Sequence, residues 1–210
     1  MLILDPIPVV IEDIDKDIEV EVPFSPKDPK LGSHQLPFTK IIYIDRPDFR
    51  EEDSKGYYRL APGKAVGLFQ APYPIKAKSF TKDDETGLVT GIVAEFDKNA
   101  KPKAYISWVP QGSIGVEARI YNSLFKSEDP KGVEGGFLND INPNSMVTYE
   151  NALIETGFEE VRRRAPWPAT VEEVKESSGP ESVRFQGMRV GYFVSLLKFM
   201  GRMIRWLTGA

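Results

Sequence analysis

Hydrophobic residues along this chain recur mainly with a period of two. Ile18, Val20 and Val22 alternate with Glu19 and Glu21, as expected for a strand with one buried face. Further runs of strand-forming residues follow, most of them bounded by glycine, proline or polar clusters: Lys40–Asp45, Ile75–Phe80, Leu88–Phe96, Ala104–Val109, Val116–Leu124, Met146–Ile154 and Val183–Phe193. Many short strands with few helical stretches predict an all-β fold class, a barrel or a sandwich.

Turn-forming residues predict how these strands are joined. Pro23–Gly32 holds three prolines and a glycine, which predicts an extended loop because proline cannot donate to a strand ladder. Pro47 is expected to start one helical turn, and Pro62-Gly63 marks a tight turn. The polar segment 81–87 between two strand-like runs predicts a β-hairpin.

Two segments have helical character. Val171–Glu176 is predicted to be a short helix with Thr170 as its N-cap. Residues 194–210 are amphipathic with a near-helical period. Three interpretations of this tail stand: a helix that binds a membrane surface or a partner, a segment that caps a barrel in place of a strand, or a product of altered splicing.

Composition excludes several kinds of site. The 210 residues include no cysteine and one histidine, so disulfides, thiolate metal sites, cysteine nucleophiles and sites needing two histidines are excluded. The N-terminus lacks the basic start of a signal peptide, and no segment approaches the roughly 20 apolar residues of a membrane span. The net charge of −4 argues against nonspecific nucleic-acid binding but is compatible with specific recognition.

Catalytic signatures are missing. Gly63-Lys64 is followed by Ala65, so the phosphate-binding Walker pattern fails. Paired carboxylates lie in charged stretches that deny them the burial needed to raise a carboxylic pKa, so they are not expected to form a catalytic dyad. His34 is interpreted as a surface-loop side chain, and Arg162–Arg164 as either a phosphate-contacting patch or a solvated face that balances neighbouring glutamates.

Two segments combine aromatic rings with polar groups suited to unstacked RNA bases. They are Tyr57-Tyr58-Arg59 and Phe185–Arg189. In a continuous strand Gln186 and Met188 face one side and Arg189 the other, unless a bulge intervenes. On pattern alone, such segments are more often ordinary strand residues than RNA-binding ones.

Seven collinear blocks across residues 4–193 give the chain a family resemblance. They are LDPIPVVIED, LGSHQLPFTKIIYIDRPDFREE, YYRLAPGKAVGL, YISWVP, ARIYNSLFKSEDP, GFLNDINPNS and RFQGMRVGYF. In these blocks the chain resembles the C-terminal anticodon-binding region of glutaminyl-tRNA synthetases, class I aminoacyl-tRNA synthetases, in their eukaryotic form.

The resemblance implies two β-barrels of the ribosomal-protein-L25-like type with short helices. The expected division is residues 1–112 for the first barrel, 113–193 for the second, with strands shared between them, and 194–210 for a divergent tail. Arg59 matches an arginine that reads the third anticodon base, a guanine, while Gln186 and Arg189 match the pair that holds the middle base, a uracil. The implied partner is glutamine-specific tRNA in the cytoplasm, with no DNA and no membrane.

The chain also departs from the family pattern. A further middle-base arginine lies upstream of the first matched block, outside this sequence, and Gly67 and Phe69 stand where bacterial members carry two arginines near the first base. The family's ATP-binding signatures occur nowhere in these residues, so we expect no cofactor here and no ligase activity from the isolated chain. ATP is expected to act in the absent catalytic domain. The alternative is a protein-interaction module, docking through its tail or its acidic N-terminal strand.

Overall fold

Strands dominate the computed structural model, which describes residues 1–166, 180–198 and 201–207. The chain divides into two compact units. The first comprises Met1–Gly115 and Ala152–Arg163, and the second comprises Val116–Asn151 and Arg164–Ala210. The expected all-β class is therefore confirmed for the residues described. The predicted helix over Val171–Glu176 lies outside them.

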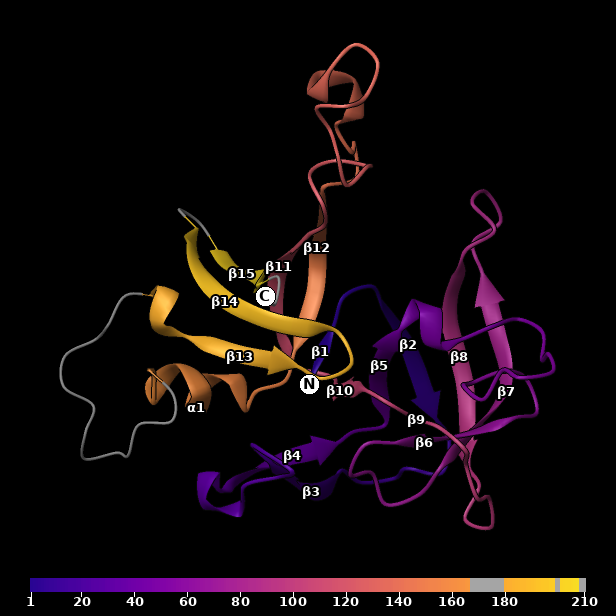
Figure 1. The fold of residues 1–210 in the computed structure, drawn as a ribbon. Coiled ribbons are helices and arrows are strands. Elements are labelled where there is room, and N and C mark those ends of the chain that lie inside the picture. Colours follow the sequence, from indigo (N-terminus) through magenta and orange to yellow (C-terminus); the bar gives the residue numbers. More distant parts are fainter. Residues whose placement is uncertain (167–179, 199–200, 208–210) are drawn as a thin grey trace. The chain divides into compact units, whose positions relative to one another are not determined.

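The first unit contains a seven-stranded sheet in the order β10-β5-β2-β8-β7-β6-β9 (Figure 1). Its strands are β2 (Pro6–Ile11), β5 (Ile41–Asp45), β6 (Ala65–Leu68), β7 (Ile75–Lys82), β8 (Val89–Phe96), β9 (Tyr105–Ile106) and β10 (Trp108–Pro110). Because β9 and β10 stand at opposite ends of this order but are separated only by Ser107, the sheet curls into a nearly closed barrel. The hairpin of β3 (Ile18–Pro23) and β4 (Ser33–Phe38) completes the unit, and β1 (Leu2–Ile3) pairs with Leu153 and Ile154.

Alternating side chains of these strands fill the barrel. Val20 and Val22 are buried while Glu19 and Glu21 between them are not, as the period of two predicts. Trp108 is fully buried, packs edge-on against Phe38 and donates from Nε1 to a backbone carbonyl at 2.7 Å. The indole therefore occupies the core with its one polar atom satisfied.

Most predicted turns are present. The proline-rich loop contains only the 3-10 turn Pro29–Leu31, and a second 3-10 turn, Arg46–Asp48, carries Pro47. At Pro62-Gly63 the amide of Lys64 donates to the carbonyl of Ala61 at 2.9 Å, which closes the expected turn. β7 and β8 form the predicted antiparallel hairpin.

One predicted strand is divided. The alternation expected over Ala104–Val109 holds for exposed Tyr105 and buried Ile106, but Ser107, Trp108 and Val109 are all buried. The prediction of a continuous alternating strand was wrong because the chain passes at Ser107 from one edge of the barrel sheet to the other.

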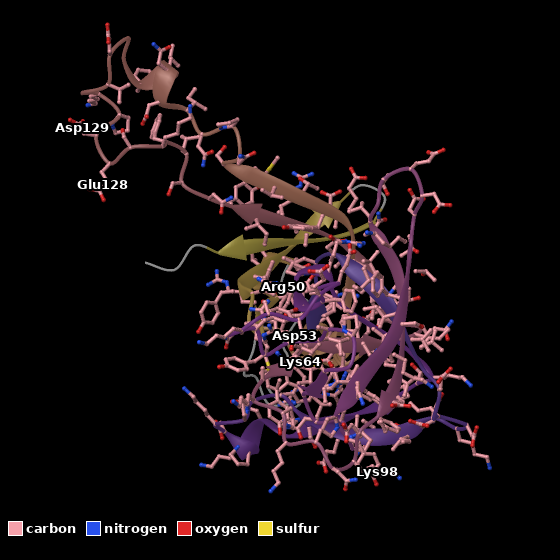
Figure 2. The ribbon with its side chains drawn as sticks, turned by 90° about the vertical axis from the view of Figure 1, so that its right-hand side faces the viewer. Arg50, Asp53, Lys64, Lys98, Glu128 and Asp129 are labelled. Carbon is pink, nitrogen blue, oxygen red and sulfur yellow. The ribbon has the colours of Figure 1, made fainter. Side chains whose placement is uncertain are left out.

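The second unit has the strand order β12-β11-β15-β14-β13. The strands made mainly or wholly of its residues are β11 (Ile114–Tyr121), β12 (Met146–Ile154), β13 (Arg184–Gly187), β14 (Gly191–Lys198) and β15 (Gly201–Leu207). Between β11 and β12 the chain makes a long excursion with a 3-10 turn at Phe137–Asp140, and Figure 2 shows Glu128 and Asp129 at its far end. A last 3-10 turn, Pro180–Ser182, precedes β13.

The helical interpretation of the tail was wrong. Most of residues 194–210 lie in β14 and β15, which pair with each other in antiparallel orientation. β15 also runs parallel to β11, with Ala118 opposite Ile204. A short apolar run is ambiguous between helix and strand, and here the open backbone groups of β11 favour a strand. The structure thus supports the interpretation in which the tail takes a strand's place in the sheet.

Candidate nucleic-acid interface

Arg59 is held at the surface by a segment whose backbone is tied to the first barrel. The amide of Leu60 donates to the carbonyl of Asp48 at 3.1 Å, and the amide of Arg50 donates to the carbonyl of Leu60 at 3.1 Å. Leu60 is fully buried. Arg59 precedes this anchor and directs its side chain outward.

The guanidinium of Arg59 rests on a buried carboxylate. Its Nη1 lies 3.0 Å from Oδ1 of Asp48, whose side chain is only 4% exposed, whereas the Arg59 side chain is 44% exposed. Nη1 also donates to the carbonyl of Pro47 at 3.3 Å. A guanidinium carries five N–H donors, so these contacts fix its position through Nη1 and, among the residues that the structure describes, leave Nε and Nη2 for a ligand.

The two tyrosines before Arg59 have different environments. Tyr57 is buried, its hydroxyl donates to the carbonyl of Leu60 at 3.4 Å, and the guanidinium of Arg50 lies 4.3 Å from its ring centre. Burial raises the pKa of the Tyr57 hydroxyl to about 12. Tyr58 is 47% exposed. Tyr57 therefore supports the segment, and Tyr58 offers its ring to solvent.

Gln186 and Arg189 belong to the hairpin of β13 and β14 in the second unit. Gln186 pairs with Tyr192 near the end of β13, and Phe185 stacks on buried Phe193 with ring centres 5.6 Å apart. Gln186 and Arg189 are both exposed. The stacked phenylalanines anchor the hairpin from which the two polar side chains project.

The turn of this hairpin re-aims Arg189. β13 ends at Gly187, and the amide of Val190 donates to the Gly187 carbonyl at 3.0 Å. Arg189 has φ +66°, in the left-handed region that glycine and asparagine normally occupy at this turn position. The expectation of a continuous strand through Met188 and Arg189 was therefore wrong. Left-handed backbone at a non-glycine residue is often retained for function.

The structure brings two of the three predicted residues together. Gln186 and Arg189 share one hairpin of the second unit, whereas Arg59 belongs to the first unit. All three are exposed, as a base-reading role requires. Sequence patterns did not identify Asp48 as the support of Arg59, because its burial depends on the fold.

Other candidates have structural roles. Arg162 and Arg163 lie on α1 (Phe158–Arg163), a helix the sequence did not predict, and pair with Glu159 and Glu160 at 2.9 and 2.7 Å. This supports the interpretation of a balanced, solvated face over a phosphate-contacting patch for these two arginines.

His34 does not lie in a surface loop. It belongs to β4, its side chain is 12% exposed, and its Nε2 lies 3.6 Å from Oε2 of Glu155. The surface-loop interpretation was wrong because residues 33–38 pair with β3, which brings the imidazole against Phe24 and Glu155. Within the described residues no cluster of three potential ligands for a metal ion occurs, and no helix is long and apolar enough to cross a membrane.

The ring of Tyr105 covers Gly67, one of the two positions at which the chain departs from the family pattern. A Cβ atom at Gly67 would lie 2.4 Å from Cδ1 of Tyr105, so the tyrosine ring lies directly on this glycine. The ring centres of Phe69 and Tyr105 are 6.4 Å apart, and Tyr105 is 53% exposed. The pattern of residues around Tyr105 predicted a strand but no binding role for this tyrosine.

Comparison with known proteins identifies the family. Residues 1–97 and 105–165 match two family models, each described as the anticodon-binding domain of class I tRNA synthetases (E and Q). The chain is 60% identical to a glutamine–tRNA ligase protein, virJ, of Hypocrea virens, 43% identical to a probable glutamine–tRNA ligase of Schizosaccharomyces pombe and 35% identical to a cytoplasmic glutamine–tRNA ligase of Arabidopsis thaliana. Each similarity covers 92% of this chain but only 30%, 25% and 23% of the respective relative. These matches, together with the strand-rich fold, show that the chain belongs to the anticodon-binding domain family of the class I glutamyl- and glutaminyl-tRNA synthetases.

Proposed function

We propose that this chain recognises the anticodon of glutamine-specific tRNA as the anticodon-binding part of a cytoplasmic glutamine–tRNA ligase. Arg59 reads the third anticodon base, a guanine, and Gln186 and Arg189 hold the middle base, a uracil. Aminoacylation and its ATP belong to the rest of such a ligase. The isolated chain binds tRNA without charging it.

The chemistry of these side chains suits the bases assigned to them. A guanidinium donates two parallel hydrogen bonds to O6 and N7 of guanine. A glutamine amide offers one acceptor and two donors, which match the mixed edge of uracil. Arg189 adds charge-assisted donors three residues from Gln186, in the same hairpin.

The observation that carries this proposal is the seating of Arg59 on Asp48. A buried carboxylate 3.0 Å from Nη1 holds one edge of a guanidinium that is otherwise half exposed. Such a side chain loses little further entropy when it binds a base, and preorganisation of this kind favours specificity. The relatives' names, all glutamine–tRNA ligases, support the choice of tRNA.

The alternative of docking through the tail has lost its main support. Residues 191–198 and 201–207 pair with each other, and β15 also pairs with β11, so their backbone groups are engaged within the sheet. The acidic strand β3 is paired with β4 along one edge.

The assay is filter binding of the purified chain to glutamine tRNA and to the same tRNA with its third anticodon base changed. The parent chain should prefer the guanine, and Arg59→Ala should reduce this preference by about 1–3 kcal/mol. Lys27→Ala, at an exposed position of the proline-rich loop, is the control and should retain the preference. An Arg59→Ala chain that discriminates as well as the parent would refute the role of Arg59.

A further inference from the structure

Two exposed tyrosines lie over one face of β6. Val66 and Leu68 are buried, so Ala65 and Gly67 face the opposite side of the strand. Tyr58 and Ala65 line the same surface pocket, and the ring of Tyr105 lies on Gly67. Positions two residues apart along a strand are separated by about 7 Å. Tyr58 and Tyr105 therefore lie at neighbouring positions, Ala65 and Gly67, of one face of β6.

Lysines surround the Tyr58 ring. The ammonium groups of Lys103 and Lys64 lie 5.2 and 5.8 Å from its ring centre, and Lys101 lines the same pocket, whose volume is about 330 Å³. Nζ of Lys64 lies 2.6 Å from Oδ1 of Asp53, so this lysine is neutralised by an ion pair (both residues are labelled in Figure 2). Over the described part of the chain, neither Lys101 nor Lys103 has a carboxylate within 4 Å. The pocket therefore carries two lysine charges, those of Lys101 and Lys103, that no ion pair within the described residues offsets.

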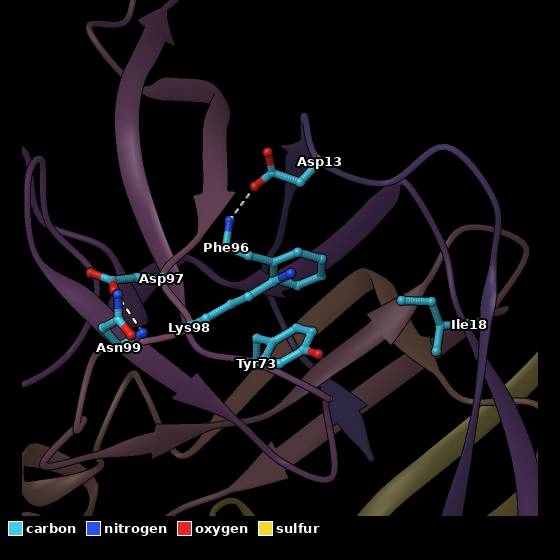
Figure 3. Close-up of a pocket in the computed structure, with 7 residues that line it drawn as sticks. All are labelled: Asp13, Ile18, Tyr73, Phe96, Asp97, Lys98 and Asn99. Atoms are coloured by element: carbon cyan, nitrogen blue, oxygen red, sulfur yellow. Dashed lines mark hydrogen bonds between the residues drawn. The ribbon is translucent and has the colours of Figure 1, made fainter.

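A second tyrosine of the same unit provides a comparison. Tyr73 is 39% exposed, and the ammonium of Lys98 lies 4.9 Å from its ring centre (Figure 3). Its pocket, however, is also lined by Asp13 and Asp97, so two carboxylates face a single lysine. Asp13 accepts a hydrogen bond from the amide of Phe96 at 2.6 Å, which fixes that negative charge beside the rings. This pocket repels a polyanion, whereas the Tyr58 pocket attracts one.

We propose that Tyr58, Lys101, Lys103 and Tyr105, here called the Tyr58–Tyr105 surface, bind two successive unpaired nucleotides of the RNA. Tyr58 and Tyr105 each stack on one base, and Lys101 and Lys103 contact the phosphates. Exposed rings beside unbalanced lysines are the combination that single-stranded nucleic acids require, because every base has a π face and every linkage carries a negative charge. The inference rests on the proposed function, since RNA is its ligand, but it concerns residues separate from Arg59, Gln186 and Arg189.

This surface contributes affinity without base identity. Stacking is tolerant of sequence, and lysine–phosphate contacts carry no base information. The Tyr58–Tyr105 surface therefore strengthens binding to correct and incorrect anticodons alike. Arg59→Ala, by contrast, is expected to change the preference between bases.

The test measures fluorescence anisotropy of a labelled anticodon stem-loop of glutamine tRNA with the full 210-residue chain. Tyr58→Ala and Tyr105→Leu should each weaken binding about tenfold, for the glutamine stem-loop and for an anticodon-swapped one. Tyr58→Phe and Tyr105→Phe keep the rings and should bind within about twofold of the parent. Tyr105→Leu keeps Gly67 covered, and Tyr73→Ala is the matched control that should leave binding unchanged.

Salt dependence tests the lysines separately. Lys103→Gln should reduce the slope of log affinity against log salt by about 0.7, the value for one phosphate of a single strand. Lys98→Gln, beside the comparison tyrosine, should not change the slope.

The outcomes separate this inference from the proposed function. If Tyr58→Ala and Tyr105→Leu bind like the parent while Arg59→Ala loses base preference, the surface is refuted and anticodon recognition stands. If the parent chain does not bind the glutamine stem-loop, both are refuted. If the tyrosine variants instead lose affinity for polyglutamate and keep their affinity for RNA, the surface binds an acidic protein segment and the inference is wrong.

Discussion

Arg189 allows the backbone and the side chain of the proposed uracil site to be tested separately. Its φ of +66° belongs to the left-handed region, and the carbonyl of Gly187 accepts a hydrogen bond from Val190 across this turn. Arg189→Ala and Arg189→Gly both remove every contact of the guanidinium. They differ only in how well the new residue tolerates this backbone conformation.

The magnitude follows from two opposing effects. A residue with a Cβ pays about 1–2 kcal/mol in the left-handed region. Glycine pays about 0.5–1 kcal/mol more than alanine in chain entropy when it is ordered. The glycine variant should therefore be more stable than the alanine variant by about 0.5–1 kcal/mol, the reverse of their order at an ordinary strand position.

Urea unfolding of the two variants measures this difference through the midpoint at constant slope. Both variants should lose affinity for glutamine tRNA to the same extent, because neither has a guanidinium. An alanine variant as stable as the glycine variant would refute the left-handed assignment of Arg189. Retained tRNA affinity in either variant would refute its contact with the middle base.

Three further predictions concern the first unit. Asp48→Asn should weaken the preference for the third anticodon base by about 1 kcal/mol, because a neutral partner holds Arg59 less firmly. In an Arg59→Ala chain the same substitution should have no further effect on the preference, which a double-mutant cycle of binding free energies will measure. Gly67→Ala should cost about 1 kcal/mol of stability or less, because the exposed Tyr105 ring can swing away from the new Cβ, but should lower stem-loop affinity as Tyr105→Leu does. Burial raises the pKa of the Tyr57 hydroxyl to about 12, against an ordinary 10, so the folded protein holds this group neutral. Its contribution to stability is complete below pH 10 and is lost as the pH rises from 10 to 12. The free energy of unfolding, measured chemically across this range, should therefore fall less for Tyr57→Phe than for the parent chain.

Local patterns predicted strands in which buried and exposed side chains alternate, and the turns that join neighbouring strands. The alternation of Val20 and Val22 with glutamates identified β3, and the polar segment before Gly87 identified the β7–β8 hairpin. Both signals depend only on neighbours along the chain, so they are visible in the sequence.

Features that depend on distant pairing were not predictable. The split at Ser107 arises because the barrel closes there, and the strand character of the tail arises because β15 pairs with β11. The same reason explains His34, whose side chain is covered by residues around Glu155.

The candidate site shows the same division between local and distant signals. Family motifs indicated Arg59, Gln186 and Arg189, all of which are exposed. The support of Arg59 by Asp48 and the left-handed turn of Arg189 appear only in three dimensions. These are also the features that convert an exposed polar residue into a positioned one.

Anticodon recognition by this chain requires that its own side chains contact the anticodon bases. The most direct measurement is filter binding of the chain, at several salt concentrations, to glutamine tRNA and to the same tRNA with its middle uracil replaced. The replaced tRNA should bind more weakly at every salt concentration, and the difference should disappear in a Gln186→Ala, Arg189→Ala chain. Equal affinity of the parent chain for both tRNAs would show that the chain does not read the middle base.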